Sequence, residues 1–189
     1  MDRGQKLMRG ALLGLPLGLP LALAACGGQQ TAATAATAPC PRIAILADGA
    51  DLTRHRPGMQ RDLTGLMLDA RIQGFEARCD FTGSDRSGLT VRITPRFEAE
   101  RGPAADGRTV DLPWFVVLSD AEDREVLARV AATTRLAFAP NVPRAQAAGQ
   151  TVQLDMPISG GRRAADYTVR VSFQLTPEEL ALNRQRGPR

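Results

Sequence analysis

The amino-acid sequence predicts a mainly β domain, an antiparallel immunoglobulin-like β-sandwich followed by a short C-terminal helix. Apolar and polar residues alternate with a period of two through much of residues 43–175, the spacing of strands with one buried face. Clusters of glycine, proline, serine and aspartate interrupt this alternation every 8 to 14 residues, as expected for a sandwich of seven or eight strands. A capping-box sequence then predicts that a helix begins at Thr176.

Residues 43–47 (IAILA) predict the first strand, and since they are apolar on both faces they favour the interior of a sheet. Residues 48–62 are mostly polar and contain Pro57 and Gly58, so they predict a connection. Alternation resumes at residues 66–73 and shifts phase at Gly74, which predicts a β-bulge or a tight bend. The inward-facing set after the shift is Phe75, Ala77, Cys79 and Phe81.

Residues 82–88 predict a turn, and residues 89–100 a long amphipathic strand in which Pro95 marks an edge or a bulge. Its inward-facing set is Leu89, Val91, Ile93, Pro95, Phe97 and Ala99. Residues 101–107 predict a loop, and residues 110–119, with Trp114 near the centre, a buried strand.

Residues 120–138 allow two interpretations: a helix capped by Asp120, or a hairpin turn followed by a strand over residues 125–138. The β surroundings and the adjacent threonines Thr133 and Thr134 favour the hairpin. Residues 139–149 predict a loop, and residues 152–158 and 167–175 predict strands on either side of a turn at residues 159–163. The helix should end near Arg184, leaving residues 185–189 as a frayed tail.

The first 25 residues predict a signal peptide. Arg3, Lys6 and Arg9 precede an uncharged apolar run of 15 residues, 11–25, a typical length for a signal peptide and shorter than the ~20 residues of a membrane-spanning helix. The run ends in Leu23-Ala24-Ala25-Cys26, which resembles the lipobox of bacterial lipoproteins. The resemblance implies cleavage after Ala25 and diacylglycerol on the sulfur of Cys26, a lasting membrane anchor. A membrane-spanning N-terminal helix and an unlipidated secretory signal are the alternatives.

Residues 26–39 then predict a flexible tether, because residues 27–39 are small, uncharged and of low complexity. The resemblance to bacterial lipoproteins also implies a location: Gly27, rather than aspartate, follows the cysteine, which in such lipoproteins favours the periplasmic face of the outer membrane over the inner membrane. With Cys26 lipidated, Cys40 and Cys79 remain as a pair in an oxidising compartment, so we expect a disulfide within a domain spanning residues 40–184.

The sequence offers little for catalysis. His55 is the only histidine, and no G-x-S-x-G motif or metal-ligand spacing accompanies it. Residues 26–189 keep 21 of the 24 basic and 19 of the 20 acidic residues, so the mature chain is nearly balanced in charge and lacks a basic stripe for nucleic acid. We therefore expect no catalytic residue, no metal and no cofactor besides the covalent lipid on Cys26.

The order of lipobox, tether, CPRIAILADGADLTRHRPG, RDLTGL, a second cysteine, RFEAERGP and SFQLTPEELALNR is similar to a family of uncharacterised lipoproteins from Gram-negative bacteria. The resemblance covers residues 23–184 and implies a location and a shared domain, with no assigned activity. The positions to test under it are Arg56, Arg101 and residues 176–183.

Two functions remain open from the sequence. The first is a non-enzymatic, lipid-anchored protein that binds or scaffolds another envelope component at its strand edges or loops. The second is an enzyme or small-ligand carrier that uses arginine and acidic side chains in a loop-lined cleft.

Overall fold

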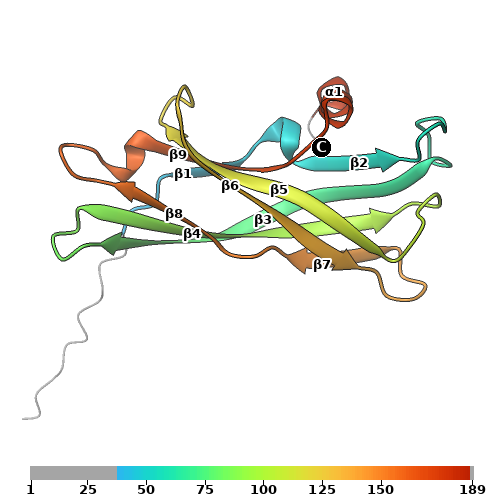
Figure 1. The fold of residues 1–189 in the computed structure, drawn as a ribbon, viewed down its shortest axis with the longest axis horizontal. Helices are drawn as coiled ribbons and strands as arrows, with labels where there is room; N and C mark the ends of the chain where they lie inside the picture. Colours follow the sequence, from blue (N-terminus) through green and yellow to red (C-terminus); the bar gives the residue numbers. More distant parts are fainter. Residues whose placement is uncertain (1–37, 188–189) are drawn as a thin grey trace, which may run out of the picture. The chain divides into compact units, whose positions relative to one another are not determined.

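The computed structural model describes residues 38–187, so the expected signal peptide, Leu23-Ala24-Ala25-Cys26 and nearly all of the tether lie outside the described residues. Nine strands, two short 3-10 helices (η1, Ala47–Gly49; η2, Ala164–Asp166) and one α-helix make up this part of the chain (Figure 1). The predicted class, mainly β with antiparallel sheets and a short C-terminal helix, is confirmed.

Sheet A has four strands in the order β1-β9-β5-β6. They are β1 (Arg42–Ile45), β9 (Tyr167–Phe173), β5 (Thr109–Asp120) and β6 (Val126–Ala137). All neighbours are antiparallel except β1 and β9, which run parallel. The strand predicted at residues 43–47 therefore exists at the edge of its sheet, and the prediction of an interior position was wrong. Ile43 and Ile45 pack against the core, so the apolar run fills one face and does not need a second partner strand.

Sheet B has five strands: β2 (Asp51–His55), β3 (Leu66–Thr82), β4 (Gly88–Arg101), β7 (Arg144–Ala148) and β8 (Val152–Pro157). β4 pairs with β3 along one side, and on the other side with β8 and then β7. β2 and β7 fall in the stretches 48–62 and 139–149, where a connection and a loop were predicted, so both predictions were wrong. Each of these strands has only five residues, and pairing with a longer strand holds each in place.

The irregularity predicted at Gly74 is a register shift between Ile72 and Gly74 in the β3–β4 pair. Pro95 lies opposite Phe75, close to that shift, so the bulge interpretation is confirmed and the edge interpretation is wrong. β8 pairs with β4 as far as Ile93 and β7 from Arg96 onward. Pro95 thus occupies the gap between the two partners, where no N–H is needed for a ladder.

The segment after Asp120 is a hairpin turn between β5 and β6, as favoured, and the helix interpretation is wrong. The Asp120 carboxylate accepts the N–H of Arg124 at 2.6 Å and that of Glu125 at 3.1 Å. Asp123 has a positive φ of 57°, a conformation that aspartate tolerates better than most residues. The turn is therefore built by local aspartates rather than by helical capping.

The two sheets enclose one apolar core. Trp114 of β5 is fully buried and lies 5.8 Å from the Phe97 ring of β4, which in turn lies 5.5 Å from Phe173 of β9. The indole N–H donates to the Thr134 hydroxyl at 2.9 Å, so the one polar atom of the ring is satisfied. All six residues of the inward-facing set predicted for β4 are buried. Ala77 of the β3 set is exposed instead.

A disulfide joins Cys40 to Cys79 with the Cα atoms 5.4 Å apart, as predicted. It fastens the segment that precedes β1 to the second half of β3. Ala38, which was predicted to lie in the tether, is buried against the core two residues before Cys40.

The C-terminal helix α1 spans Pro177–Arg186 and begins with the predicted capping box at Thr176. It runs to Arg186, beyond the end predicted near Arg184, because Arg186 reaches the Thr53 hydroxyl at 3.1 Å and Asn183 is buried against β2. Among residues 38–187, no helix is long and apolar enough to cross a membrane.

Candidate functional site

A groove of about 700 Å³ opens where β2 ends, between that strand, the loop at residues 56–65 and α1. Residues 53–55 of β2 form one wall, and Glu178, Glu179 and Leu182 of α1 form the other. Met67 of β3 and Pro57 contribute apolar surface, and Arg61 enters from the loop. Segments more than a hundred residues apart in the chain thus share one concave surface.

Arg54 is the residue that ties these segments together. Its Nε donates to Glu179 Oε1 at 3.1 Å, and its Nη1 donates to the Asp111 carbonyl of β5 at 3.2 Å. The side chain of Glu179 is 12% exposed and that of Arg54 is 35% exposed, so the ion pair is partly shielded from water. Arg54 therefore connects the edge of sheet B with α1 and with sheet A.

The first turn of α1 is fully capped. The Glu179 N–H donates to the Thr176 hydroxyl at 3.2 Å, and the second Glu179 carboxylate oxygen accepts the Thr176 N–H at 2.8 Å. Pro177 has no N–H to offer, and Leu180 N–H already donates to the Thr176 carbonyl. Since these N–H groups are occupied, the groove cannot bind an anion in the manner of an open helix N-terminus.

Glu178 is held as an anion at the helical wall. A hydrogen bond from its own backbone N–H lowers the pKa of this carboxyl below its ordinary value, with further lowering by the Thr176 hydroxyl and the charge of Arg61. Glu179 is likewise engaged by donors on both oxygens. Glu178 is therefore suited to fix a positive group in place rather than to deliver a proton.

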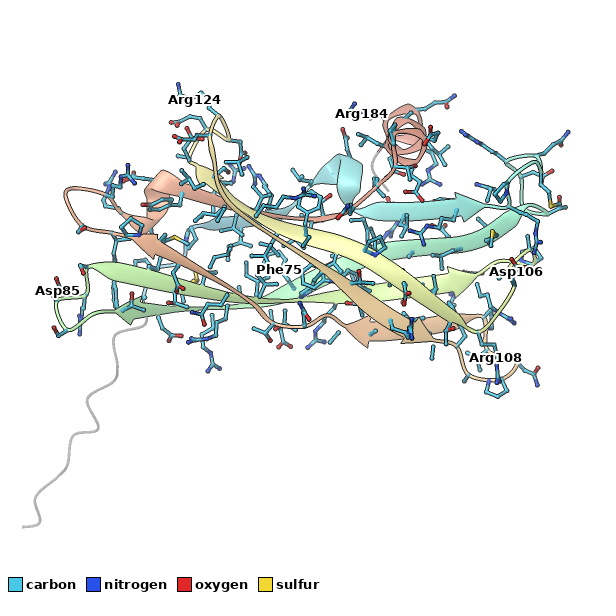
Figure 2. All side chains as sticks on the ribbon, viewed as in Figure 1. Phe75, Asp85, Asp106, Arg108, Arg124 and Arg184 are labelled. Atoms are coloured by element: carbon cyan, nitrogen blue, oxygen red, sulfur yellow. A yellow bond between two sulfur atoms is a disulfide. The ribbon has the colours of Figure 1, made fainter. Side chains whose placement is uncertain are left out.

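A second groove, of about 180 Å³, lies on the other side of Arg54 and Met67 and extends toward Arg101, Asp106 and Phe138. Arg56 forms an ion pair with Asp106 and also donates to the Ala104 carbonyl at 2.6 Å. Asp106 lies at the end of the sheets opposite Asp85 (Figure 2). Of the positions singled out by the resemblance, Arg101 lines this second groove, whereas members of residues 176–183 line the first; Arg54 and Met67 line both.

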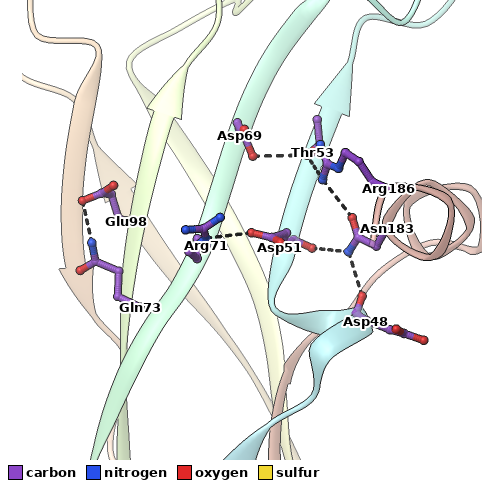
Figure 3. A network of polar contacts seen from close by, with 9 residues as sticks. All are labelled: Asp48, Asp51, Thr53, Asp69, Arg71, Gln73, Glu98, Asn183 and Arg186. Atoms are coloured by element: carbon purple, nitrogen blue, oxygen red, sulfur yellow. Dashed lines mark hydrogen bonds and ion pairs between the residues drawn. The ribbon is translucent and has the colours of Figure 1, made fainter. Parts of the chain in front are cut away.

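The second half of α1 is fixed to β2 by a polar network (Figure 3). The Asn183 amide nitrogen donates to the carbonyls of Asp48 and Asp51, both at 2.8 Å. The buried Asp51 carboxylate accepts from Arg71 Nε at 3.1 Å. This network sets the position of the helix, and with it the width of the groove.

His55 does not lie in a connection, as the sequence suggested, but ends β2 and lines the groove. No group of three or more histidine, cysteine, aspartate or glutamate side chains that could hold a metal ion occurs among the described residues. The expectation of no metal and no cofactor stays a prediction.

Sequence reasoning did not find the groove. Its central pair, Arg54 and Glu179, is separated by 125 residues, and no spacing motif connects them. Met67 reaches the groove because the β2–β3 register shifts between Arg54 and His55. The sequence did contain the capping box and the arginines around His55. These signals mark residues of the groove, but they do not show that the two segments lie side by side.

Comparison with protein-family models, with curated proteins and with solved structures gave no match for this chain. Its function therefore has to be inferred from its own residues and geometry.

Proposed function

We propose that the chain is a lipid-anchored envelope lipoprotein whose β domain faces the periplasm and acts as a non-enzymatic binding or scaffolding module. The observation that carries the proposal is the disulfide between Cys40 and Cys79. The chain has three cysteines, so this bond leaves Cys26, directly after Leu23-Ala24-Ala25, as the remaining thiol for a lipid. A disulfide also agrees with an oxidising compartment such as the periplasm.

The position of the grooves suits a tethered binding module. Cys40 is bonded to β3 near the β3–β4 turn that carries Asp85, whereas Arg56 and Asp106 lie at the opposite end (Figure 2). A lipid at Cys26, on the periplasmic face of the outer membrane, would hold the Cys40 end by a short tether. The proposed partners are the membrane, through the anchor, and another envelope component at the far end.

The alternative is an enzyme or small-ligand carrier. The larger groove, about 700 Å³ in volume, favours it by gathering Arg54, Arg61, Glu178 and Glu179, and this volume falls in the range of ligand sites. The non-enzymatic role remains preferred because Glu179 is already engaged by Arg54 and by the Thr176 N–H, and the pKa of Glu178 is lowered, which disfavours its use as a proton donor.

Metabolic labelling tests the anchor. The full-length chain is produced in a Gram-negative host supplied with an alkyne-bearing palmitate analogue, and the membrane fraction is examined by in-gel fluorescence and intact mass. We expect label on the wild type and on the Cys40→Ser/Cys79→Ser pair, and none on Cys26→Ser. An unlabelled wild type, or a processed N-terminus other than Cys26, contradicts the proposal.

We also infer that the two sheets form an immunoglobulin-like β-sandwich. In support, the sheets share one core in a domain of the appropriate size. An experimental structure should give a mean angle of about 30° between the strands of the two sheets. Strands that cross at near right angles contradict the assignment.

A further inference from the structure

β2 is an edge strand, paired with β3 alone in sheet B. In an antiparallel pair, successive residues point their N–H and C=O alternately toward the partner strand and away from it. The Ile72 N–H donates to the Ala50 carbonyl at 2.9 Å, which sets the phase of this alternation. The residues of β2 whose backbone groups point away from β3 are Asp51, Thr53 and His55.

The beginning of the β2 edge already forms a hydrogen bond with another part of the domain. The Asp51 carbonyl accepts the Asn183 amide at 2.8 Å, so the second half of α1 covers the beginning of the strand. Farther along, the groove lies between the backbone of Thr53 and His55 and the first turns of α1. Arg186, from the end of α1, reaches only the Thr53 hydroxyl, at 3.1 Å. Within residues 38–187, no hydrogen bond satisfies the outward N–H and C=O of these two residues. The groove therefore contains a short row of backbone donors and acceptors at the two-residue spacing of a strand.

The side chains around this row add an apolar surface and one cation. Met67 and Leu182 line the groove on the β3 side and the helix side. Arg54 forms an ion pair with Glu179. Arg61 forms no such direct pair in the part of the chain that the structure describes, although its charge acts on Glu178 and lowers the pKa of that carboxyl. Glu178 already accepts hydrogen bonds from its own N–H and from Thr176. The formal charges of the groove therefore balance, Arg54 and Arg61 against Glu178 and Glu179. Arg61 is the one of the two arginines without a direct ion pair among the described residues, so its guanidinium can still donate to an acidic side chain of a ligand.

We propose that this groove binds an extended peptide segment of a partner protein as an added strand on β2. The peptide backbone hydrogen-bonds Thr53 and His55, one apolar side chain packs between Met67 and Leu182, and an acidic side chain pairs with Arg61. Adding a strand to an exposed edge is a common mode of peptide recognition, with affinity from the backbone and specificity from alternate side chains. The inference rests on the binding role proposed above and names the class of partner.

The probe is a library of linear 12-residue peptides displayed on phage, selected against the full processed chain in detergent. The most enriched peptide is then synthesised, and its binding is measured by calorimetry. We expect enriched sequences in which an acidic residue lies near an apolar one. Nuclear magnetic resonance should show that bound peptide shifts the Thr53 and His55 amide signals more than those of β8.

Thr53→Pro removes the outward N–H and should weaken binding of the selected peptide by about tenfold or more, as expected when interface hydrogen bonds are lost. Thr53→Val keeps that N–H and removes only the hydroxyl, so its affinity should stay close to wild type. Gln153→Pro is the matched control, because the Gln153 N–H also points outward, from the edge of β8. Arg61→Ala should weaken acidic peptides and leave a peptide with the acid replaced by its amide unchanged.

The following results would overturn the inference. The first is a selection that enriches no peptide. The second is a selected peptide that binds the Thr53→Pro chain as tightly as the wild type. The third is a peptide whose affinity falls as much in Gln153→Pro as in Thr53→Pro. A dimer in which a second copy occupies the β2 edge and excludes peptide also contradicts it. The anchor is judged separately: a palmitate-labelled chain that selects no peptide sinks this inference alone, and an unlabelled chain that binds peptide sinks only the anchor.

Discussion

The buried amide of Asn183 is one of the contacts that hold α1 to sheet B, beside the Arg54–Glu179 ion pair and the hydrogen bond from Arg186 to Thr53. Its nitrogen donates to two backbone carbonyls, those of Asp48 and Asp51, and the residue is 6% exposed. In Asn183→Ala the Asp51 carbonyl loses this donor in a buried site and the Asp48 carbonyl loses it in a partly buried one, which costs about 1–3 kcal/mol of unfolding free energy. Urea denaturation followed by far-ultraviolet circular dichroism measures the loss.

The neighbouring Arg184 provides the control for this prediction. It pairs with the Asp48 carboxylate at 2.9 Å, but its side chain is 64% exposed. An exposed ion pair of this kind contributes only about 0–1 kcal/mol, so Arg184→Ala should leave the denaturation midpoint nearly unchanged. Equal losses in both variants would mean that the contact with Asp48, and not the buried amide, fixes the helix.

Asp123, in the β5–β6 turn, makes the free energy of unfolding depend on pH. The Ser119 hydroxyl, and after it Arg170, lowers the pKa of its carboxyl below the ordinary value. Because the pKa is lower in the folded state, the stabilisation is complete above the unfolded value of about 3.9 and is lost as pH falls through the folded value. We expect a smaller loss of stability below pH ~4 in Asp123→Asn than in the wild type.

Urea denaturation at a series of pH values measures how the free energy of unfolding changes with pH. Asparagine tolerates the positive φ of 57° at position 123, so the substitution tests the charge rather than the turn. Glu122→Gln removes a charge from the adjacent residue, whose side chain is 62% exposed, and should retain the wild-type slope. A parallel change in both variants would assign the effect to net charge.

At the scale of elements, the strands that could be predicted are those in which the alternation of apolar and polar residues coincides with alternate burial. β4 and β9 bury alternate apolar side chains in the shared core, so a period of two reveals them. β2 and β7 were missed for different reasons. The five residues of β2, DLTRH, are mostly polar, and those of β7, RAQAA, are mostly alanine. Their β conformation comes from pairing with β3 and β4, which local propensity does not encode.

The groove was beyond prediction for a related reason. It requires the register shift at Arg54, the meeting of Arg54 with Glu179, and the attachment of α1 by Asn183. Each of these depends on tertiary packing between distant segments. The capping box at Thr176 was predicted because all its partners lie within four residues.

The disulfide is the device that secures the edge strand β1. β1 pairs only with β9, over four residues, and the Cys40–Cys79 bond lies just before it. Closing a loop with a sequence separation of 39 is worth about 4 kcal/mol on the chain-entropy model. The Cys40→Ser/Cys79→Ser chain should lose stability of that order, while Cys26→Ser should not. Thermal unfolding with and without reductant measures both, and insensitivity of the wild type to reductant would contradict the prediction.

At the scale of the whole molecule, the shared core requires the two sheets to unfold together. The Phe97 ring from sheet B lies between Trp114 and Phe173 from sheet A, and each is at most 1% exposed. Neither sheet retains a covered apolar face once the other is removed, so separate stable halves are not expected. Trp114 is the only tryptophan, and its fluorescence therefore reports the state of this core.

Matched truncations in the two sheets test this cooperativity. Leu112 of β5 and Ile93 of β4 are both fully buried, and replacing either with alanine should cost about 2–5 kcal/mol. Trp114 fluorescence and far-ultraviolet circular dichroism should give one coincident transition in each variant, shifted to lower urea. If Ile93→Ala shifted only the circular dichroism change and left the Trp114 transition in place, the sheets would be separate folding units. The groove between α1 and β2 would then belong to sheet B alone, although Arg54 joins it to Asp111 of sheet A.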